Sequence, residues 1–380
     1  MKKIVIIHQS AELYGSDKML LLFLTHLDKS KFFVVVILPS SGPLQTALEQ
    51  LGLEVHLAPV LKIYRNIVKP NNLFQFSKQF KSSLRFLETL HKKHHFDVVY
   101  SNTLAVLLGM FFARKHKIKH LWHVHEIVEH PKIIAQLFPK LLNKYADVVV
   151  CNSLATQNNL VQRQPALKFK TRLVYNGLET QKSQASNATK TDFGFSNNDT
   201  VVTLVGRISR LKGHQWVLQT IVNELSDVKN LVFLFVGSPV SGQEIYLENV
   251  QTFIKIHQLE AKVKILPFSE HLADIWTITN IALMPSTEAE SFGLVAAEAM
   301  LAQKPVIAAN LGGLKEIIVP NETGFLVAPY HQKELKEAIL NLHQNPKLQS
   351  EIGKNARTHI QNNFDIQQHV TQLEQLLEQL

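Results

Sequence analysis

The feature that most constrains the fold is a series of short, β-rich apolar runs, each followed by a stretch long enough for a helix. In the first half these runs are residues 3–7, 33–38, 55–57, 97–100, 120–124 and 147–151, and in the second half 200–205, 231–236, 263–266, 281–284 and 305–308. Continuous apolar runs of this length are typical of strands buried on both faces of a parallel sheet with crossover helices. The sequence therefore predicts an α/β protein with two Rossmann-like sheets.

A polar segment at residues 181–198, rich in Ser, Asn, Thr, Gln and Lys, separates the two series of runs. Such composition favours a linker. We therefore expect an N-terminal domain over 1–180 and a C-terminal domain over 199–355, with their sheets facing across a cleft. Apolar residues at helical spacing near the end predict an amphipathic C-terminal helix over 356–380.

Composition excludes a disordered or coiled-coil chain, since 46% of the 380 residues are hydrophobic and 19% are charged. The net charge of +9 is unevenly spread: residues 1–190 carry 26 Lys and Arg against 11 Asp and Glu, and the remainder carry 14 against 20. This asymmetry suggests that the first half faces an anionic partner. Because zinc-finger spacing and aromatic RNA-binding signatures are missing, we expect no nucleic acid.

The sequence also favours a cytoplasmic location. Cys151 is the single cysteine, which fits a reducing compartment. The basic start is followed by too few apolar residues for a signal peptide. The longest apolar run, residues 104–113, is far short of the ~20 residues that span a bilayer.

A basic segment lies at residues 62–95, where eight Lys and Arg face one acid, Glu88. Apolar residues recur there at helical spacing, so one interpretation is a domain helix with a solvated basic face. The other is a peripheral patch on an anionic membrane surface, where each basic residue contributes ~1 kcal/mol. The basic residues are Lys62, Arg65, Lys69, Lys78, Lys81, Arg85, Lys92 and Lys93.

The first candidate ligand motif directly follows the run 200–205. Arg207 follows Gly206 and stands five positions before Lys212, which precedes a second glycine, Gly213. A glycine there lets the backbone approach a ligand, and the two cations could neutralise a pyrophosphate. A solvated basic loop is the alternative interpretation.

The second motif follows the run 281–284 and contains Glu290, Ser291, Phe292, Gly293, Leu294 and Glu298. The apolar pattern predicts a helix from about Gly293, which places Glu290 in the preceding loop. On one continuous helix eight residues rise about 12 Å, more than the roughly 5–9.5 Å of a glycosidase carboxylate pair. Two carboxylates that hold different hydroxyls of one ligand fit better than a hydrolase, and surface glutamates are the alternative.

The third motif is His123-Val-His125-Glu126, at the end of a predicted strand, where α/β proteins bind ligands. Alternation puts both histidines on one face and Glu126 on the other. Ordinary core histidines are the alternative. A zinc site is rejected, because His125 and His130 are five residues apart and lie about 140° apart on a helix.

Together the motifs at Gly206-Arg207 with Lys212 and at Glu290-x7-Glu298 resemble those of retaining GT-B glycosyltransferases of group 1, family 4. Further segments over most of the chain resemble the same family. These are its N-terminal glycine loop at Glu12–Asp17, the domain-ending turn at Val174–Gly177, and later loops at Gly312–Ile317 and Thr323–Phe325. The resemblance implies a GT-B fold whose C-terminal helix crosses back to the N-terminal domain.

The resemblance also implies residue roles. His125, Glu290, Arg207 and Lys212 would be catalytic, with His123 and Glu126 as acceptor-side candidates and His123 as the rival of His125 for contact with the sugar. Glu298 would bind the ribose, and no metal or other cofactor would be needed, because Arg207 and Lys212 hold the diphosphate. The donor site would comprise Gly15, Ser16, Gly206, Arg207, Lys212, Glu290, Ser291, Phe292, Gly293, Leu294 and Glu298.

The expected activity is retaining transfer of a sugar from a UDP-, GDP- or ADP-linked donor to a glycan or lipid-linked acceptor. The family often assembles surface polysaccharide or lipopolysaccharide, and its basic N-terminal domain favours a membrane-surface location. Two alternatives stay open from the sequence. One is a nucleotide-sugar epimerase of the same architecture, and the other is a sugar-nucleotide-binding protein without turnover.

Overall fold

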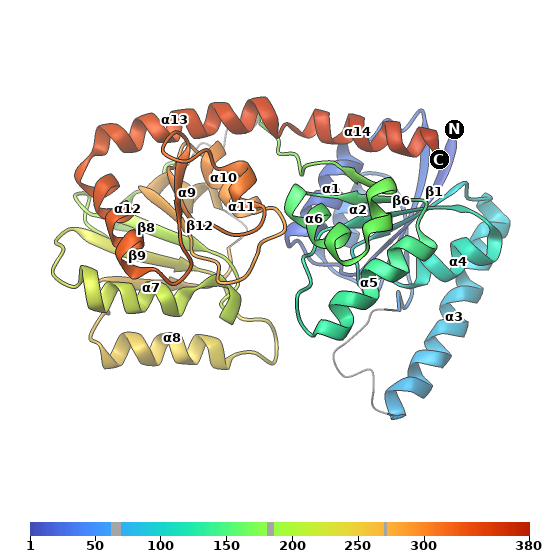
Figure 1. Ribbon diagram of the computed structural model, residues 1–380, viewed down its shortest axis with the longest axis horizontal. Helices are drawn as coiled ribbons and strands as arrows, with labels where there is room; N and C mark the ends of the chain where they lie inside the picture. Colours follow the sequence, from blue (N-terminus) through green and yellow to red (C-terminus); the bar gives the residue numbers. More distant parts are fainter. Residues whose placement is uncertain (62–69, 181–185, 270–271) are drawn as a thin grey trace. The chain divides into compact units, whose positions relative to one another are not determined.

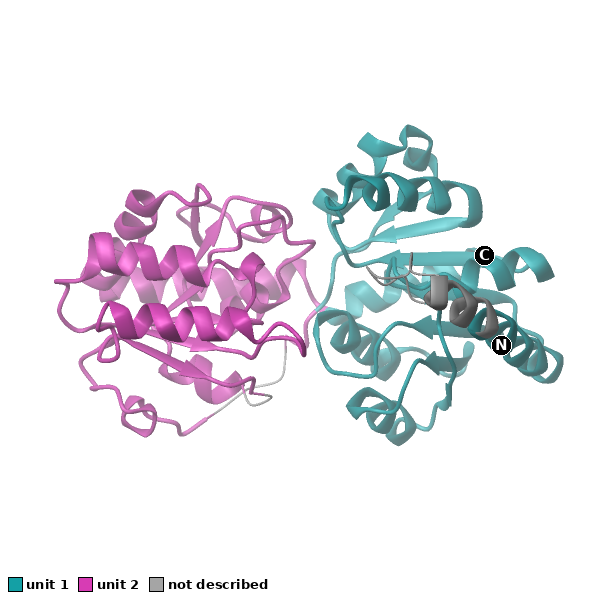
Figure 2. Ribbon diagram, turned by 90° about the horizontal axis from the view of Figure 1, so that it is seen from below, with its two compact units in different colours: residues 1–177, 366–380 teal, residues 178–365 magenta. Residues whose placement is uncertain are grey.

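The computed structural model describes residues 1–61, 70–180, 186–269 and 272–380, with the backbone alone given for 70–78. The chain forms two compact units, one of residues 1–177 with 366–380 and the other of residues 178–365 (Figure 2). Of the expected linker, residues 181–185 lie outside the described residues. Residues 186–198 belong to the second unit and include a 3-10 turn, Lys190–Phe193.

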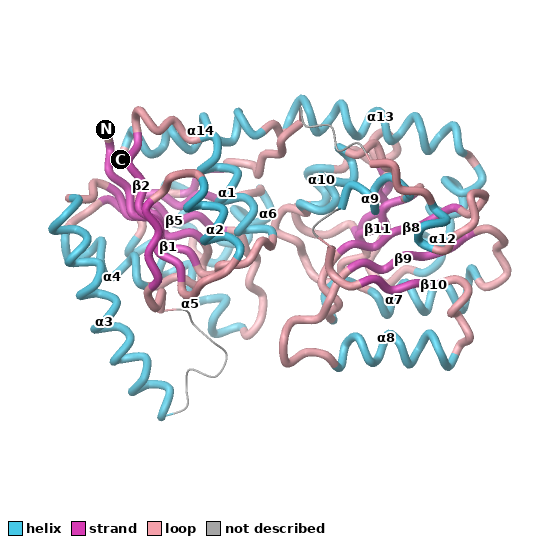
Figure 3. Tube along the Cα trace, turned by 180° about the vertical axis from the view of Figure 1, so that it is seen from behind, coloured by secondary structure: helices cyan, strands magenta, loops and turns pink. Residues whose placement is uncertain are grey.

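The first unit is built on a seven-stranded parallel sheet of order β3-β2-β1-β4-β5-β6-β7 (Figure 3). The chain runs outward from β1 and then returns past it to β4, so the topology switches between these two strands. Ligands bind at such a switch, beyond the carboxyl ends of the strands. The strands are β1 (Lys2–His8), β2 (Phe32–Leu38), β3 (Glu54–Leu57), β4 (Val98–Asn102), β5 (Lys119–Val124), β6 (Val148–Cys151) and β7 (Thr171–Leu173).

Helices cover this sheet and bury its apolar side chains. Helices α3 to α6 contribute to one continuous core with the sheet, while α1 packs against α2 and α14. Figure 1 shows α14, from the end of the chain, beside α1. The helices are α1 (Gly15–His26), α2 (Pro43–Gln50), α3 (Pro70–His94), α4 (Leu108–His116), α5 (Lys132–Tyr145), α6 (Leu154–Arg163) with the 3-10 turn Pro165–Phe169, and α14 (Ile366–Gln379).

The second unit repeats the same plan with a six-stranded parallel sheet of order β10-β9-β8-β11-β12-β13. Its topological switch lies between β8 and β11, whose carboxyl ends carry the two motifs predicted to bind a ligand. The strands are β8 (Thr200–Val205), β9 (Leu231–Val236), β10 (Val263–Leu266), β11 (Ile281–Met284), β12 (Val306–Ala309) and β13 (Gly324–Val327).

Helices of the second unit pack on both faces of its sheet. Helices α7, α8 and α12 share one buried core with the strands, and α10 packs against α13. The helices are α7 (His214–Thr220), which continues as a π turn (Ile221–Leu225), α8 (Ile245–Ile256), α9 (Leu272–Ile278), α10 (Leu294–Leu301), α11 (Leu314–Ile317), α12 (Gln332–Gln344) and α13 (Pro346–Asn363). Within the described residues, no helix combines the length and apolarity needed to cross a bilayer.

The α/β fold class predicted from the sequence is confirmed, and each predicted apolar run contains a strand. Strands β7 and β13 were not predicted. Assigning Thr323–Phe325 to a loop was wrong, because Gly324 and Phe325 lie in β13 and pair with Val306 and Ile307. Strand β7 (Thr171–Leu173) has one apolar residue in three, and β13 opens with a glycine, so neither begins as the apolar runs of the predicted strands do.

The C-terminal segment differs from the single helix expected over residues 356–380. Helix α13 begins at Pro346 and ends at Asn363, and α14 begins at Ile366. Between them Phe364 leaves the helical conformation, packs its buried ring 5.6 Å from that of Phe292, and accepts a backbone hydrogen bond from Leu178. Helix α14 belongs to the first unit, so the expected return of the C-terminal helix is confirmed. The cleft stays a prediction.

Candidate functional site

The first motif of the second unit forms the loop that joins β8 to α7. The loop ends in a 3-10 turn, Arg210–Lys212, followed by Gly213 in the left-handed conformation (φ +75°). A Cβ on Gly213 would lie 1.8 Å from the carbonyl oxygen of Pro285, in the loop after β11. Glycine is therefore required here, because the two loops approach each other backbone to backbone.

Hydrogen bonds then fix these two loops to one another. The amide of Thr287 donates to the Leu211 carbonyl at 2.9 Å, and its hydroxyl donates to the Arg210 carbonyl at 3.1 Å. The Arg210 guanidinium donates to the Glu288 carboxylate. Because the loop backbones are joined in this way, the side chain that follows, Lys212, is held over the segment that carries Glu290.

Lys212 and Glu290 form a partly buried ion pair. The Lys212 Nζ lies 2.5 Å from Glu290 Oε1, with side chains 25% and 19% exposed. The Ser286 hydroxyl donates to the same carboxylate oxygen. Burial raises the pKa of Glu290, but the charge of Lys212, the hydrogen bonds from Lys212 and Ser286 and the charge of Arg207 outweigh it and hold the pKa below its usual range. Glu290 is therefore ionised at neutral pH.

The rest of the second motif forms the start of α10. Gly293 precedes the helix at φ +102°, where a Cβ would lie 2.6 Å from the Leu314 side chain. Phe292 is buried against Phe364, so its side chain supports the fold rather than facing a ligand. The first-turn amides of α10, which begins at Leu294, have no intrahelical acceptor and favour negative charge.

The structure brings some of the expected donor-site residues together. Lys212 and Glu290 are in direct contact, and the charge of Arg207 acts on Glu290. Arg207 is exposed and follows Gly206 at the end of β8. Glu298 lies half-buried in the second turn of α10, and Ser291 is half-buried before that helix.

In the first unit, the glycine loop leads into α1. Tyr14 precedes the helix, Gly15 is its first residue, and Ser16 is half-buried. The Asp17 carboxylate accepts a hydrogen bond from the Tyr14 amide at 3.0 Å and so caps the helix. Gly15 is exposed, and a Cβ on it would meet no atom within 4 Å among the described residues.

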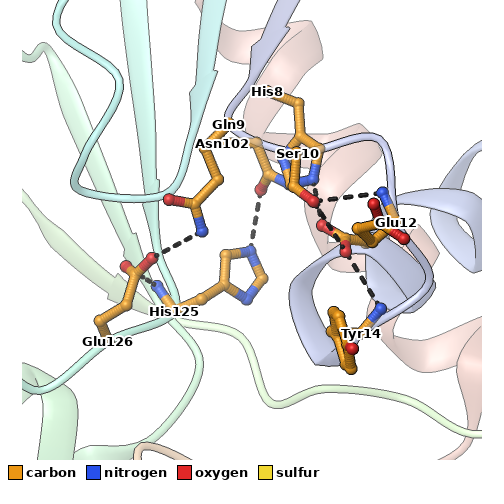
Figure 4. Close-up of polar contacts among 9 residues, drawn as sticks. His8, Gln9, Ser10, Glu12, Tyr14, Asn102, His125 and Glu126 are labelled. Carbon is orange, nitrogen blue, oxygen red and sulfur yellow. Dashed lines mark hydrogen bonds and ion pairs between the residues drawn. The ribbon is translucent and has the colours of Figure 1, made fainter. Parts of the chain in front are cut away.

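The two histidines of the third motif lie on one face of the sheet, as alternation predicts, with ring centroids 4.0 Å apart. His123 is buried inside β5, and its Nδ1 lies 2.6 Å from the Tyr100 hydroxyl. His125 follows the strand, and its Nε2 lies 2.8 Å from Asn102 Oδ1 (Figure 4). His125 is thus at the carboxyl edge of the sheet, whereas His123 is within its interior.

The side chain of Glu126 forms hydrogen bonds along this edge of the sheet. Its carboxylate accepts hydrogen bonds from the backbone amides of Leu104 and His125, at 3.1 and 3.2 Å. The Gln9 side chain donates to it at 3.5 Å, as Figure 4 shows. Because Leu104 follows β4 and Gln9 follows β1, Glu126 joins the ends of three strands.

Burial makes the histidines of this motif neutral. Burial, assisted by the nearby His8 and His369, lowers the pKa of His125 to about 3. Burial likewise lowers the pKa of His123 well below its usual value, assisted by His125 and His369. Both imidazoles are uncharged at neutral pH, and His125, at the edge of the sheet, can form hydrogen bonds with a ligand without carrying charge.

Sequence reasoning missed three residues of these sites, His8, Asn102 and Ser286, and it included Asp17 in the glycine loop without a role. His8 and Asn102 are the last residues of β1 and β4, the two strands that flank the topological switch. Polar residues at the ends of neighbouring parallel strands are the signal that could have found them. Ser286 has a similar position, two residues after β11.

Within the described part of the chain, no group of three or more His, Cys, Asp or Glu residues could hold a metal ion. His130 is exposed at the surface, whereas His125 is buried at the end of β5.

The fold and these sites define a class of protein. Two Rossmann-like units in one chain, with ligand motifs at the carboxyl edges of their sheets, are the architecture of GT-B glycosyltransferases. A solved structure of Anabaena HepE in complex with UDP has 25% identity and a TM-score of 0.84, and the match covers 100% of both chains. Sucrose-phosphate synthase from Thermosynechococcus elongatus, at 20% identity and a TM-score of 0.79, shares the fold over 100% of this chain and 99% of its own.

Comparison of the sequence with models of known protein families identifies its family. A model described as glycosyl transferases group 1 matches residues 186–359, and one described as glycosyltransferase family 4 matches residues 15–182. The chain belongs to the group 1 glycosyltransferases. A D-inositol 3-phosphate glycosyltransferase of Rhodococcus opacus is 29% identical over 57% of this chain, and the match spans about half of that relative's length (50%).

Proposed function

We propose that this glycosyltransferase moves a sugar from a nucleotide-sugar donor to a glycan or lipid-linked acceptor, with retention of anomeric configuration, in bacterial-type surface polysaccharide or lipopolysaccharide assembly. The observation that carries the proposal is the Lys212–Glu290 pair at the carboxyl edge of the second sheet, beside the N-terminus of α10. The similar Anabaena protein is bound to UDP in one solved structure and to UDP-glucose in another, which supports a UDP-sugar as the first donor to test.

Arg207 and Lys212 would neutralise the diphosphate of the donor. The ammonium of Lys212 has three N–H donors, and its contact with Glu290 leaves others for phosphate oxygens. Negative charge grows on the departing diphosphate during transfer, so fixed cations and the first-turn amides of α10 lower the barrier. This arrangement does the electrostatic work of a divalent ion, and we propose that the reaction needs no metal.

The two carboxylates would grip hydroxyl groups at opposite ends of the donor. We assign the hydroxyls of the transferred sugar to Glu290 and those of the ribose to Glu298, with the Gly206 turn, Ser291 and the backbone at 292–294 lining the site. Ribose is common to UDP, GDP and ADP donors. Glu290 is already paired with Lys212 and so serves as a fixed acceptor rather than as a nucleophile.

His125 would contact the sugar near the reacting carbon, since it is the member of the histidine pair at the carboxyl edge. With its pKa lowered to about 3 it is a weak base at neutral pH, so its role is hydrogen bonding and not proton abstraction. The leaving phosphate would then accept the acceptor's proton on the same face of the sugar, which accounts for retention. Gly15 and Ser16 would line the donor side of the first unit, and His123 and Glu126 would support the acceptor side.

We also propose that the enzyme is cytoplasmic and binds the inner surface of the membrane through α3. On this helix Leu87 and Leu90 are buried in the core, while Lys81 and Arg85 are exposed. Lys92 and Lys93 are exposed as well, whereas Lys62, Arg65, Lys69 and the side chain of Lys78 lie outside the described residues. An exposed basic face on a well-packed helix supports attraction to anionic lipid.

A thermal-shift screen with UDP, GDP, ADP and their glucose conjugates tests the donor site. A nucleotide at ~100 times its dissociation constant should stabilise the protein by about 2.7 kcal/mol. Incubation with the bound donor alone should leave the sugar unisomerised, and transfer should begin on addition of an oligosaccharide or lipid-linked acceptor from a panel. The proposal fails if no nucleotide raises the melting temperature, or if the donor alone is epimerised.

A further inference from the structure

A chain of four buried polar side chains crosses the carboxyl edge of the first sheet. It runs from Asp17 on α1 through His8 on β1 and Asn102 on β4 to His125 after β5, and Figure 4 labels the last three of these residues. His8 Nε2 lies 2.6 Å from Asp17 Oδ1, Asn102 Nδ2 lies 3.0 Å from His8 Nδ1, and His125 Nε2 lies 2.8 Å from Asn102 Oδ1. The exposed fractions are 2% or less, except for His125 at 9%.

The direction of these hydrogen bonds follows from the chemistry of Asp17. A carboxylate oxygen accepts hydrogen bonds, so His8 donates from Nε2, and its Nδ1, which faces the amide nitrogen of Asn102, is the bare ring nitrogen. The bare Nδ1 accepts from the amide nitrogen of Asn102, whose carbonyl oxygen must then face His125 and accept from its Nε2. Every hydrogen in the chain therefore points toward Asp17.

This direction leaves His125 with one tautomer. Because burial keeps the imidazole neutral, a proton on Nε2 means that Nδ1 carries a lone pair. Nδ1 has no hydrogen-bond partner among the described residues and is not among their fully buried atoms. His125 thus presents an acceptor, and not a donor, at the edge of the sheet.

We propose that Asp17, His8 and Asn102 are positioning residues that lock His125 as a hydrogen-bond acceptor for a hydroxyl group of the bound sugar. The inference rests on the proposed function in one respect only, namely that the hydroxyl group belongs to a sugar. The tautomer itself is a property of the ligand-free protein. The carboxylate of Asp17 selects the tautomer of His125, although two hydrogen-bonded residues, His8 and Asn102, lie between them.

The substitution Asp17→Asn reverses the chain. Asp17 Oδ2 accepts from the Tyr14 amide at 3.0 Å and from the Ser10 hydroxyl at 3.3 Å, so the carbonyl oxygen of the substituted side chain stays on that side. The new amide nitrogen then faces His8 Nε2 and donates to it. His8 moves its proton to Nδ1, the Asn102 amide turns over, and His125 accepts at Nε2 and carries its proton on Nδ1.

Two further variants serve as matched controls. Asn102→Asp places an acceptor-only group against both histidines, so His125 keeps its proton on Nε2 although the chain is altered. Asp28→Asn makes the same carboxylate-to-amide change at an exposed turn of the first unit, where Asp28 accepts from the Ser30 amide and hydroxyl. It should leave His125 unchanged.

The experiment is ¹⁵N NMR of the full-length protein labelled at histidine, with the His125 signals assigned from a His125→Gln variant. In wild type, Asn102→Asp and Asp28→Asn, Nδ1 of His125 should give the shift of a bare ring nitrogen. In Asp17→Asn it should give the shift of an N–H nitrogen, with native melting temperature and circular dichroism. A protonated Nδ1 in wild type, or a bare Nδ1 in folded Asp17→Asn, overturns the proposal.

Transfer kinetics give a separate readout that depends on the donor. Asp17→Asn should lower kcat/KM about tenfold with the natural donor, since one hydrogen bond to the sugar is lost. With a deoxy-sugar donor that lacks the recognised hydroxyl, the same variant and wild type should be equal. If the tautomer switches as described but neither donor distinguishes the variants, the assignment of His125 to the sugar fails while the tautomer lock stands.

Discussion

Removing the charge of Lys212 should affect both catalysis and stability, because its ammonium pairs with a carboxylate that is largely buried. Breaking a fully buried pair costs about 3–5 kcal/mol, and the quarter exposure of Lys212 reduces this to about 1–3 kcal/mol for Lys212→Met. Because we propose that Lys212 neutralises the leaving diphosphate, its loss should also lower kcat about 10²–10³-fold. Urea unfolding and steady-state transfer with the bound donor measure the two effects.

The same ion pair predicts how stability should change with pH in wild type and in Lys212→Met. The folded pKa of Glu290 is depressed, so its ionisation adds stability above the unfolded pKa of about 4.5, and this stability is lost as pH falls through the folded value. In Lys212→Met the main lowering influence is gone and burial raises the pKa. The variant should therefore lose less stability than wild type, or gain some, between pH 7 and 4.

A double-mutant cycle measures the interaction energy of the Lys212–Glu290 pair separately from the other contacts of each side chain. Glu290→Gln removes the charge that Lys212→Met leaves unpaired, so the double variant should be more stable than the sum of the single changes predicts. Arg210→Met is the matched control, since its guanidinium is 61% exposed where it pairs with Glu288, and it should cost less than about 1 kcal/mol. Additive single effects, or equal losses in the Lys212 and Arg210 variants, would refute the reasoning.

Three further substitutions test other parts of the structure. Gly213→Ala should lower the free energy of unfolding in urea by about 1–3 kcal/mol or more, because a left-handed backbone and a carbonyl oxygen at 1.8 Å both oppose a Cβ. An unfolding midpoint equal to that of wild type would contradict this. Glu298→Ala should lower kcat/KM about 10–100-fold through loss of charge-assisted ribose contacts, with unchanged stability and an unaffected Glu351→Ala control. Leu87→Ala should cost about 2–5 kcal/mol, measured by chemical denaturation, if α3 is packed as described.

The fold could be predicted because its central strands are buried on both faces. A strand such as β1 or β9 must be apolar along its whole length, and that pattern is visible without any structure. Strand β7 has only one apolar residue in three, and β13 opens with a glycine, so neither shows this pattern along its whole length. The break at Phe364 was missed for a related reason, since the ring it packs against, Phe292, is distant in sequence.

The candidate site was only partly visible in the sequence. Lys212 and Glu290 were found because glycines and charged residues cluster around them, although they are far apart along the chain. Their direct contact depends on Gly213 passing over Pro285, which no sequence pattern reveals. His8 and Asn102 were missed because a single polar residue at a strand end looks ordinary until the strand order places it beside another.

The carboxyl edges of the two sheets carry side chains of different chemistry at equivalent positions. In the second unit, the charge of Lys212 holds the pKa of Glu290 low and keeps this carboxylate ionised, and fixed cations suit a ligand whose charge grows during the reaction. In the first unit, burial keeps His125 neutral, and its hydrogen bonds are directed by a single carboxylate at the far end of the chain. A neutral acceptor with a fixed tautomer suits a hydroxyl group, which must be oriented but carries no charge. Phosphate binding should therefore weaken with salt, since exposed Arg207 is screened, while recognition of the sugar hydroxyl should not.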